Sequence, residues 1–301
     1  MKFSVHQNSQ QGGRERNEDR MGYCYTRQSC LLMLADGMGG HPEGATAAHL
    51  ALQVLSGRFQ KLAQPLLRQV PAFLSDGLLH AHHHIIRYAA DKGMLDTPRT
   101  TLVAAVIERN QLHGIHCGDS RLYVVRSNGA VLRTRDHSML ERHKQVSGLP
   151  PANRNLLLSC LGSSSVPVFD LSGPIELRSG DRILLCSDGL WSVLNDGELV
   201  RGLGQGPLDE AVDRLVDEAL RRAGSKADNV SALAVDWEAQ DDFRTTRVST
   251  EALPEGVFSS TLDANAAQQA SESVWDMDDE TIERTIAEIN EAIRRTAARK
   301  P

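Results

Sequence analysis

The stretch LLMLADGMGGHPEGA, Leu31 to Ala45, decides how this chain folds. It opens with five apolar residues and changes abruptly at Asp36 to a carboxylate followed by glycines. A short apolar run of this length is typical of a buried strand, and helical apolar spacing begins at Gly44. We therefore predict a buried strand that ends at Asp36, a loop of bare backbone, and then a helix.

Length and composition indicate a globular chain. With 301 residues, 41% of them hydrophobic, it can form one large domain or two small ones around a substantial core. No apolar run approaches the roughly 18 residues that a membrane span needs, and the N-terminus has no signal-like apolar centre. We expect a cytoplasmic protein that does not bind membranes. The five cysteines show no C-x-x-C spacing, which favours reduced core residues.

The negative charge lies mainly in the C-terminal part of the chain. Residues 240–301 contain 13 acidic and 7 basic residues, which accounts for the net charge of −6. The rest of the chain is neutral and has no basic cluster that could neutralise phosphates of nucleic acid. Nucleic acid is therefore excluded as an expected partner.

Apolar patterning predicts strands and helices in separate blocks. The expected strands are Cys30–Ala35, Thr101–Ile107, Leu112–Cys117, Leu122–Arg126, Arg182–Ser187 and Val230–Trp237. The expected helices are Gly44–Leu62, Pro71–Asp91 and Leu208–Ala223. Because a helix does not follow every strand, the pattern favours an α+β fold with helices packed on sheets over a doubly wound parallel sheet.

Two short segments look like hairpin turns between these strands. They are Glu108–Asn110 and Ser127–Gly129, and in the second the Asn-Gly pair favours a type I′ turn. Such tight connections indicate antiparallel meanders.

The C-terminal part is expected to differ from the body. Residues 240–273 are rich in Ala, Gln, Ser, Thr and Asp, which indicates a polar, disordered linker. A helix is expected over 274–301, where Ile282, Ile286, Ile289 and Ile293 form a narrow apolar seam. The seam fits packing either on the chain's own domain or on a partner helix.

Acidic residues recur beside small residues at the ends of the expected strands. They occur in Asn17-Glu18-Asp19, Asp36-Gly37, Gly118-Asp119, Asp188-Gly189 and Asp228-Asn229. Gathering several carboxylates costs Coulomb repulsion and desolvation unless cations neutralise them. Oxygen ligands select hard ions such as Mg²⁺ or Mn²⁺, and glycine lets a backbone carbonyl approach an ion. We predict a two-ion centre in which Asp36 bridges the ions and the Gly37 carbonyl is a further ligand.

Seven sequence blocks carry a family resemblance. They are GGRERNED, ADGMGGH, RTTLVAA, CGDSRLY, RDHS, LCSDGLW and ADNVSAL, in this order between residues 12 and 233. Together the blocks resemble the bacterial metal-dependent serine/threonine protein phosphatases of type 2C, over roughly four fifths of the chain. The resemblance implies a catalytic domain over 1–239, folded as a four-layer α-β-β-α sandwich with two central antiparallel sheets.

The resemblance also assigns a role to each acidic block. It makes Asp36 the bridging ligand, Glu18 and the Gly37 carbonyl ligands of one ion, Asp188 and Asp228 ligands of the other, Asp19 an outer acid that orients metal-bound water, and Asp119 a ligand of a third, weaker ion.

The implied reaction is hydrolysis of phosphoserine and phosphothreonine by a metal-bridged hydroxide. Arg14 matches the arginine that grips the substrate phosphate, and its planar fork suits two phosphate oxygens. His41 is the candidate for the proton donor to the leaving oxygen, because histidine titrates near neutral pH, and a metal-bound water or His137 is the competing assignment. The implied partners are phosphorylated proteins and an opposing Ser/Thr kinase.

Two other functions are alternatives for a chain with these acids. One is a catalytically silent member that binds phosphoproteins, and the other is a phosphohydrolase of nucleotides or small metabolites. The chain keeps every metal carboxylate and has no G-x-x-x-x-G-K-[ST] motif, so both are disfavoured.

Two stretches stand apart from this pattern. The segment 138–161, where bacterial members carry a flap beside the active site, is shorter here and lacks the usual Gly-x-Ile-Ser/Thr element. The tract HAHHH, from His80 to His84, is expected to be a solvated helix face, with chelation of added metal as the alternative.

Overall fold

A computed structural model describes residues 1–139, 141, 157–237, 246–249 and 259–260. All of them belong to one compact unit, Met1–Leu262. The predicted C-terminal helix with its isoleucine seam, most of the predicted linker and most of the flap segment lie outside the described residues. Within the described part, no helix is long and apolar enough to cross a lipid bilayer.

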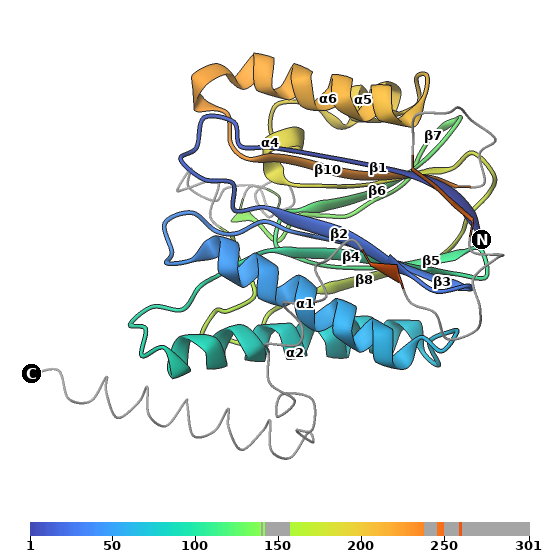
Figure 1. Ribbon diagram of the computed structural model, residues 1–301. Helices are drawn as coiled ribbons and strands as arrows, with labels where there is room; N and C mark the ends of the chain where they lie inside the picture. The colour runs from blue at the N-terminus through green and yellow to red at the C-terminus, as the bar shows by residue number, and fades with distance from the viewer. Residues whose placement is uncertain (140, 142–156, 238–245, 250–258, 261–301) are drawn as a thin grey trace, which may run out of the picture. The chain divides into compact units, whose positions relative to one another are not determined.

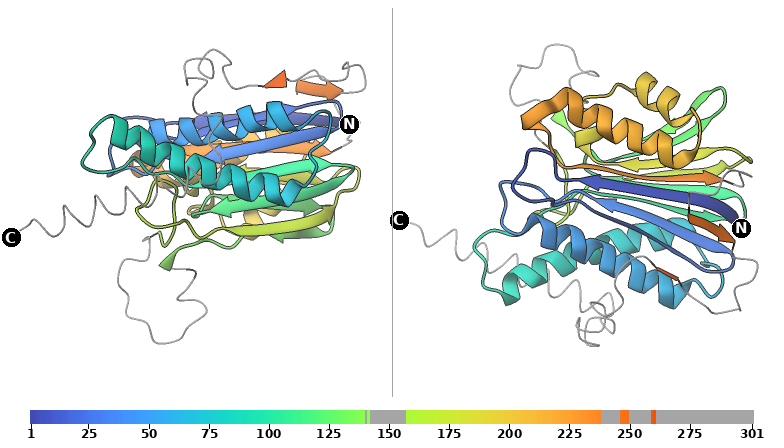
Figure 2. Two further views of the ribbon diagram at one scale, coloured as in Figure 1. Left: turned by 90° about the horizontal axis from the view of Figure 1, so that it is seen from below. Right: turned by 45° about the horizontal axis from the view of Figure 1, so that its top comes forward.

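The fold has two antiparallel sheets with helices on their outer faces (Figures 1 and 2). The first sheet has the order β11 (Thr246–Ser249), β1 (Lys2–Gln10), β10 (Val230–Trp237), β9 (Arg182–Cys186), β6 (Arg121–Arg126) and β7 (Gly129–Arg133). The second has the order β12 (Ser259–Ser260), β2 (Arg20–Tyr25), β3 (Ser29–Ala35), β4 (Leu102–Glu108), β5 (Gln111–Cys117) and β8 (Asp170–Glu176).

The helices complete the outer layers. The second sheet is covered by α1 (Gly44–Leu62) and α2 (Val70–Asp91), and the first by α4 (Asp188–Trp191), α5 (Asp196–Leu203) and α6 (Leu208–Ala223), followed by the 3₁₀ turn Gly224–Lys226. The predicted α+β, four-layer α-β-β-α architecture is therefore confirmed.

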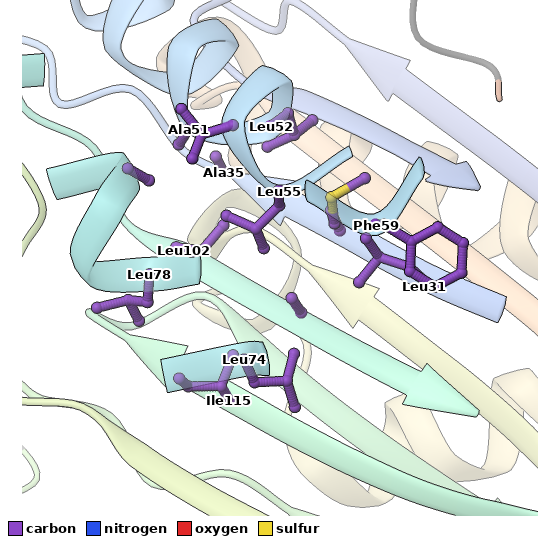
Figure 3. Packing of buried hydrophobic residues seen from close by; sticks show 14 of the residues in the cluster. Leu31, Ala35, Ala51, Leu52, Leu55, Phe59, Leu74, Leu78, Leu102 and Ile115 are labelled. Atoms are coloured by element: carbon purple, nitrogen blue, oxygen red, sulfur yellow. The ribbon is translucent and has the colours of Figure 1, made fainter. Parts of the chain in front are cut away.

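Three apolar clusters fill the three interfaces between these layers. All seven residues of β3 are buried, with Leu31 and Met33 packed toward the helices and Leu32 and Leu34 packed between the sheets. Figure 3 shows the helix-facing cluster, where Leu31 lies beside Phe59 of α1. The continuous apolar run is thus explained by burial on both faces of the strand.

The predicted helices and strands occur in the structure with ends shifted by at most one residue. The sequence patterns missed β1, β2, β7, β8, α4 and α5. Strand β1 is instructive because only Phe3, Ser4 and Val5 of its nine residues are buried. Its pairing with the fully buried β10, with Gln10 opposite Val230, makes it a strand despite a weak pattern. The five cysteines are free and buried, as predicted.

Both predicted hairpins form, but the type I′ turn connects β4 to β5 and not β6 to β7. Arg109 and Asn110 connect β4 to β5 with φ of 50° and 60°, the left-handed values that a type I′ turn requires. Between β6 and β7, Gly129 pairs with Arg126, and only the glycine has positive φ. The type I′ prediction for Asn128-Gly129 is therefore wrong: a register shift near Val125 places this glycine in the strand.

The linker prediction for 240–273 is wrong at two short segments. Thr246–Ser249 pairs antiparallel with β1, and Ser259–Ser260 pairs with β2, so each forms the outer strand of a sheet. Such pairing uses backbone N–H and C=O groups, which every non-proline residue offers, and composition therefore gives little warning of it.

The Arg109 turn yields a stability prediction. A residue other than glycine, asparagine or aspartate in the left-handed region costs roughly 1–2 kcal/mol. We expect Arg109→Asn to raise the melting temperature by about 1–4 °C, because asparagine tolerates this conformation better. Thermal unfolding measures the effect, and Arg109→Gln, which removes the charge without the backbone advantage, is the control. Equal melting temperatures for the two variants would contradict the explanation.

Candidate metal centre

The strand registers bring the predicted acidic blocks to one end of the sandwich. Arg20 at the start of β2 pairs with Ala35 at the end of β3, and Arg121 at the start of β6 pairs with Cys186 at the end of β9. The end of β1 likewise pairs with the start of β10. The loops that carry the acids therefore all emerge at the end that lies to the left in Figure 1.

A cavity of about 720 Å³ opens at this end. Its lining residues are Arg14, Glu15, Arg16, Glu18, Asp36, Gly37, Met38, Gly39, Thr101, Asp119, Ser138, Leu157, Asp188, Trp191, Ser192, Asp228 and Asn229. The structure thus brings together all the predicted site residues except Asp19 and His41.

Asp36 is held in place by the paired threonines that precede β4. Its backbone N–H donates to Thr101 Oγ1 at 3.0 Å, and its carbonyl accepts from Thr101 N–H at 2.9 Å and from Thr100 Oγ1 at 2.8 Å. Because the N–H and the carbonyl of Asp36 are both hydrogen-bonded, its carboxylate extends from a fixed point at the end of β3. The sequence block RTTLVAA did not reveal this role of its threonines.

Gly37 is a position where only glycine fits. A Cβ atom there would lie 2.5 Å from the backbone of Gly44 and 2.8 Å from the carbonyl oxygen of Glu18. The start of α1 and the β1–β2 loop thus close on the Gly37 backbone from two sides, which places a bare peptide at the wall of the cavity.

Asn229 fastens the loop that carries Arg14 and Glu18. Its Oδ1 accepts from the Glu18 N–H at 2.9 Å, while its Nδ2 donates to the carbonyls of Gln11 at 2.8 Å and Arg16 at 3.0 Å. The side chain is buried, and it stands next to Asp228. Sequence reasoning named this asparagine only as the neighbour of an acid; its place between Asp228 and an apolar strand was the available signal.

Asp19 lies behind the cavity wall and is only 4% exposed. Its Oδ2 accepts from Ser187 Oγ at 2.8 Å, and its Oδ1 is buried without a hydrogen-bond partner. An unpaired carboxylate oxygen in such a place is costly unless water or a cation supplies a partner.

Burial, together with repulsion between neighbouring carboxylates, raises the pKa values of several of these acids. Burial, followed by repulsion from neighbouring carboxylates, places the pKa values of Asp36 and Asp188 well above 3.8. Burial raises the pKa of Asp19 to about 6, despite serine hydroxyls that favour its charged form, and raises that of Asp119 to about 7. The cavity is therefore a strongly electronegative site that binds protons when nothing else neutralises it.

Arg14 supplies positive charge at the rim. Its Nη2 donates to Asp228 Oδ2 at 2.5 Å, and this hydrogen bond is the main reason why its pKa is raised. The arginine side chain is 55% exposed, so it can exchange this partner for a ligand that enters the cavity.

The donor set fits hydrated divalent cations. It offers carboxylate oxygens and a bare glycine peptide, with the unpartnered Asp19 Oδ1 nearby. Mg²⁺ and Mn²⁺, which keep several waters in an octahedral shell, suit such an oxygen-only donor set.

Neither candidate histidine lines the cavity. His41 Nδ1 bonds to Asp96 Oδ2 at 2.8 Å, in an ion pair outside the cavity that also includes Arg99. His137 bonds to Asp170 instead. The structure does not bring His41 into the cavity, because Asp96 from the segment after α2 holds its ring.

The chain matches a known protein family over most of its length. The "Protein phosphatase 2C" family matches residues 7–234, a span that includes every lining residue of the cavity. This chain belongs to the protein phosphatase 2C family. It is 28% identical to the serine/threonine phosphatase stp of Listeria innocua, over 77% of this chain and 90% of that protein. It is 30% identical to the serine/threonine protein phosphatase PstP of Mycobacterium tuberculosis, over 86% of this chain and 49% of PstP.

Solved structures of family members share the fold. The catalytic domain of PstP in complex with two manganese ions has a TM-score of 0.64 and 29% identity, over 78% of this chain and 98% of that one. Stp1 from Staphylococcus aureus has a TM-score of 0.69 and 28% identity, over 77% of this chain and 94% of that one.

The raised pKa values predict how stability depends on pH without metal. A carboxylate with a raised folded-state pKa binds more protons folded than unfolded, so its contribution to stability is lost as pH rises through that pKa. Above about pH 7.5 the buried histidines, whose pKa values are lowered, are largely neutral in both the folded and the unfolded state and contribute little to the slope. In EDTA we expect the free energy of unfolding to fall by roughly 1 kcal/mol between pH 7.5 and 8.5.

Denaturant unfolding at the two pH values measures this slope. Asp36→Asn should flatten it, because the remaining acids lose a repelling neighbour, whereas Asp217→Asn on the exposed face of α6 should not. Saturating Mn²⁺ should remove the slope in the unsubstituted chain. Stability that stays level or rises with pH in EDTA would contradict the electrostatic description.

Asn229 yields a second prediction for this site. Asn229→Ala removes three hydrogen bonds to the β1–β2 loop and should cost about 1–3 kcal/mol of stability. Because that loop carries Glu18, the Mn²⁺ concentration for half-maximal activation should rise about tenfold. Asn8→Ala, which removes a bond to Asp213 on α6, is the control and should leave Mn²⁺ activation unchanged. Unaltered activation in Asn229→Ala would refute the positioning role.

Proposed function

We propose that this chain is a metal-dependent protein phosphatase that hydrolyses phosphoserine and phosphothreonine with two Mg²⁺ or Mn²⁺ ions and opposes a Ser/Thr kinase. The observation that carries the proposal is one cavity that combines the acids Glu18, Asp36, Asp119, Asp188 and Asp228 with Arg14. The family assignment and the names of the relatives, which are serine/threonine phosphatases, support it.

The cavity residues divide between holding cations and binding substrate. We assign the bridging position to Asp36, one ion to Glu18 and the Gly37 carbonyl, and the other ion to Asp188 and Asp228. Asp119 is available to a third ion. Asp19, which lies behind the cavity wall, would orient water bound in the cavity. When bound, the ions supply an activated water and neutralise charge on the phosphoryl oxygens.

Arg14 is assigned to the substrate phosphate. Its guanidinium donates a hydrogen bond to Asp228 and its side chain is 55% exposed. On releasing Asp228, which would help to hold a cation, the planar guanidinium can bind two oxygens of a phosphate at the rim. This exchange of partners places positive charge where negative charge develops as the phosphoryl group is transferred.

Trp191 gives the cavity a rigid wall. It is the last residue of α4, which begins at Asp188, and the Arg121 guanidinium lies 3.7 Å from its ring centroid. Arg121 is itself fixed by two 2.7 Å bonds to Asp136. The stacked Trp191 and Arg121 side chains thus connect α4, which begins at Asp188, with β6, which follows Asp119.

The candidates for the proton donor to the leaving oxygen are His41, His137 and a water in the cavity, and neither histidine lines the cavity. The bond from His41 to Asp96 gives no support to the histidine. A His41→Ala variant that keeps the wild-type pH profile would leave His137 or water as the donor.

The decisive experiment is hydrolysis of a phosphothreonine peptide with Mn²⁺, with Mg²⁺ and with excess EDTA. Turnover that requires metal supports the proposal. Absence of turnover with either metal in a folded chain would favour a silent phosphoprotein-binding module, and a strong preference for nucleotide or metabolite phosphates would favour the other alternative.

Substitutions in the cavity test the individual roles. Asp36→Asn and Asp188→Ala should each lower kcat by about a thousandfold or more while the fold is retained, because they remove metal ligands and also relieve repulsion. Circular dichroism checks the fold. Near-wild-type rates in either variant would refute the two-ion assignment.

Arg14 is tested separately. Arg14→Ala should raise KM for the phosphopeptide about tenfold or more, since a charge-assisted, two-pronged contact is lost. Arg14→Lys should be intermediate because lysine keeps the charge without the fork. Arg68→Ala, an exposed arginine between α1 and α2, is the control. Unchanged kcat/KM in Arg14→Ala would rule out the phosphate role.

A further inference from the structure

Two histidines and an aspartate gather outside the cavity. His116 lies on β5, Asp170 lies opposite it on β8, and His137 follows β7. One ring nitrogen of each histidine and a carboxylate oxygen of Asp170 lie within 4.8 Å of one another. In the part of the chain that the structure describes, this is the one such group of three or more histidine, cysteine or acidic side chains.

His116 has an unused ligand atom. Its side chain is buried, with the residue 2% exposed, and its Nε2 donates to the carbonyl of Arg135 at 2.7 Å. That bond places the ring proton on Nε2, so Nδ1 carries a lone pair, and Nδ1 is buried without a hydrogen-bond partner. Metal-binding histidines commonly donate their second nitrogen to a carbonyl in this way. A buried acceptor without a partner is costly unless a water or a metal ion occupies it, so this nitrogen is a candidate metal ligand.

The other two residues lie beside the His116 ring. The His137 ring stacks on the His116 ring with centroids 4.6 Å apart and planes at 15°, and its Nε2 lies 3.2 Å from Asp170 Oδ2. The Asp170 side chain is 60% exposed, so the cluster is reached from solvent. Burial lowers the pKa of His116, which keeps its ring neutral and able to bind a metal.

We propose that His116, His137 and Asp170 form a second metal site, which selects Zn²⁺ or a similar imidazole-binding ion. Two imidazoles and one carboxylate leave a fourth tetrahedral position for water. Ligand atoms about 2.0–2.2 Å from a tetrahedral zinc ion lie roughly 3.3–3.6 Å apart, so the site closes by a shift of up to about 1.5 Å. Closure also requires the His137 ring to turn out of its stack on His116, because stacked rings direct their nitrogen lone pairs along near-parallel planes. The exposed Asp170 side chain and the turn of the His137 ring supply these movements. The two imidazole nitrogens distinguish the metal preference of this site from that of the oxygen-lined cavity, which suits Mg²⁺ or Mn²⁺.

The site is linked to the cavity through Gly118. His137 N–H donates to the Gly118 carbonyl at 2.9 Å, and its Nδ1 accepts from the Gly118 N–H at 3.3 Å. A metal on Nε2 requires the ring proton to be on Nδ1, which would break the second bond beside Asp119. Zinc bound here should therefore displace the Asp119 loop. This consequence rests on the proposed function, whereas the metal site itself does not.

Calorimetric titration of the full chain with Zn²⁺, in Mg²⁺ concentrations that saturate the cavity, tests the site. We expect one zinc ion to bind with micromolar or tighter affinity. Asp170→Asn and His137→Gln should each weaken it at least tenfold, and neither replaces a core side chain. Glu176→Gln, at the other end of β8, is the matched control and should bind zinc like the unsubstituted chain.

The histidine tract of α2 is the competing source of zinc binding. The variant His80→Gln/His84→Gln should keep the affinity if the proposed site is the one measured. Zinc binding that disappears in this variant, that persists unchanged in Asp170→Asn, or that is absent from the unsubstituted chain would overturn the proposal. Because the titration does not involve turnover, its outcome is independent of whether the chain proves to be a phosphatase.

Discussion

Repulsion among carboxylates at one end of the sandwich is the constraint on which the rest of the structure depends. Asp36, Asp119, Asp188 and Asp228 would separate if flexible loops carried them, because each raises the energy of the others' charged forms. They are instead held at strand ends whose positions are set by sheet pairing and by the core clusters on both faces. The stability of the buried sheets thus keeps the acids close together until cations neutralise them.

Neutral hydrogen bonds do the local positioning. Thr100 and Thr101 fix the Asp36 peptide, Asn229 fixes the Glu18 loop, and Ser187 fixes Asp19. None of these groups adds charge to the cavity, so the electronegative field is available to cations. Arg14 is the cationic partner at the rim, and its exposed side chain leaves it able to change partners. The site therefore combines acids at fixed strand ends with the exposed cationic side chain of Arg14 at the rim.

Much of the fold and the site could be predicted from the sequence, and the failures have physical causes. Strand β3 was predicted because burial on both faces requires a continuous apolar run. Strand β1 was missed because only three of its nine residues are buried, so its apolar pattern is weak although it pairs along its length with β10. The edge strands Thr246–Ser249 and Ser259–Ser260 were missed because backbone pairing leaves little trace in composition. The tract HAHHH was expected to be solvated, yet His82 is buried and accepts from the Gly162 N–H.

The sequence by itself determined the family, the layered fold class and the residues of the cavity, because strand-end acids beside glycines and the ordered blocks are local features of the chain. Only the tertiary structure decided that His41 turns to Asp96, that Asn229 clasps the β1–β2 loop, and that His116 meets His137 and Asp170. Each of these contacts joins side chains far apart in sequence. Their partners are chosen by strand register and loop packing, which no single stretch of residues encodes.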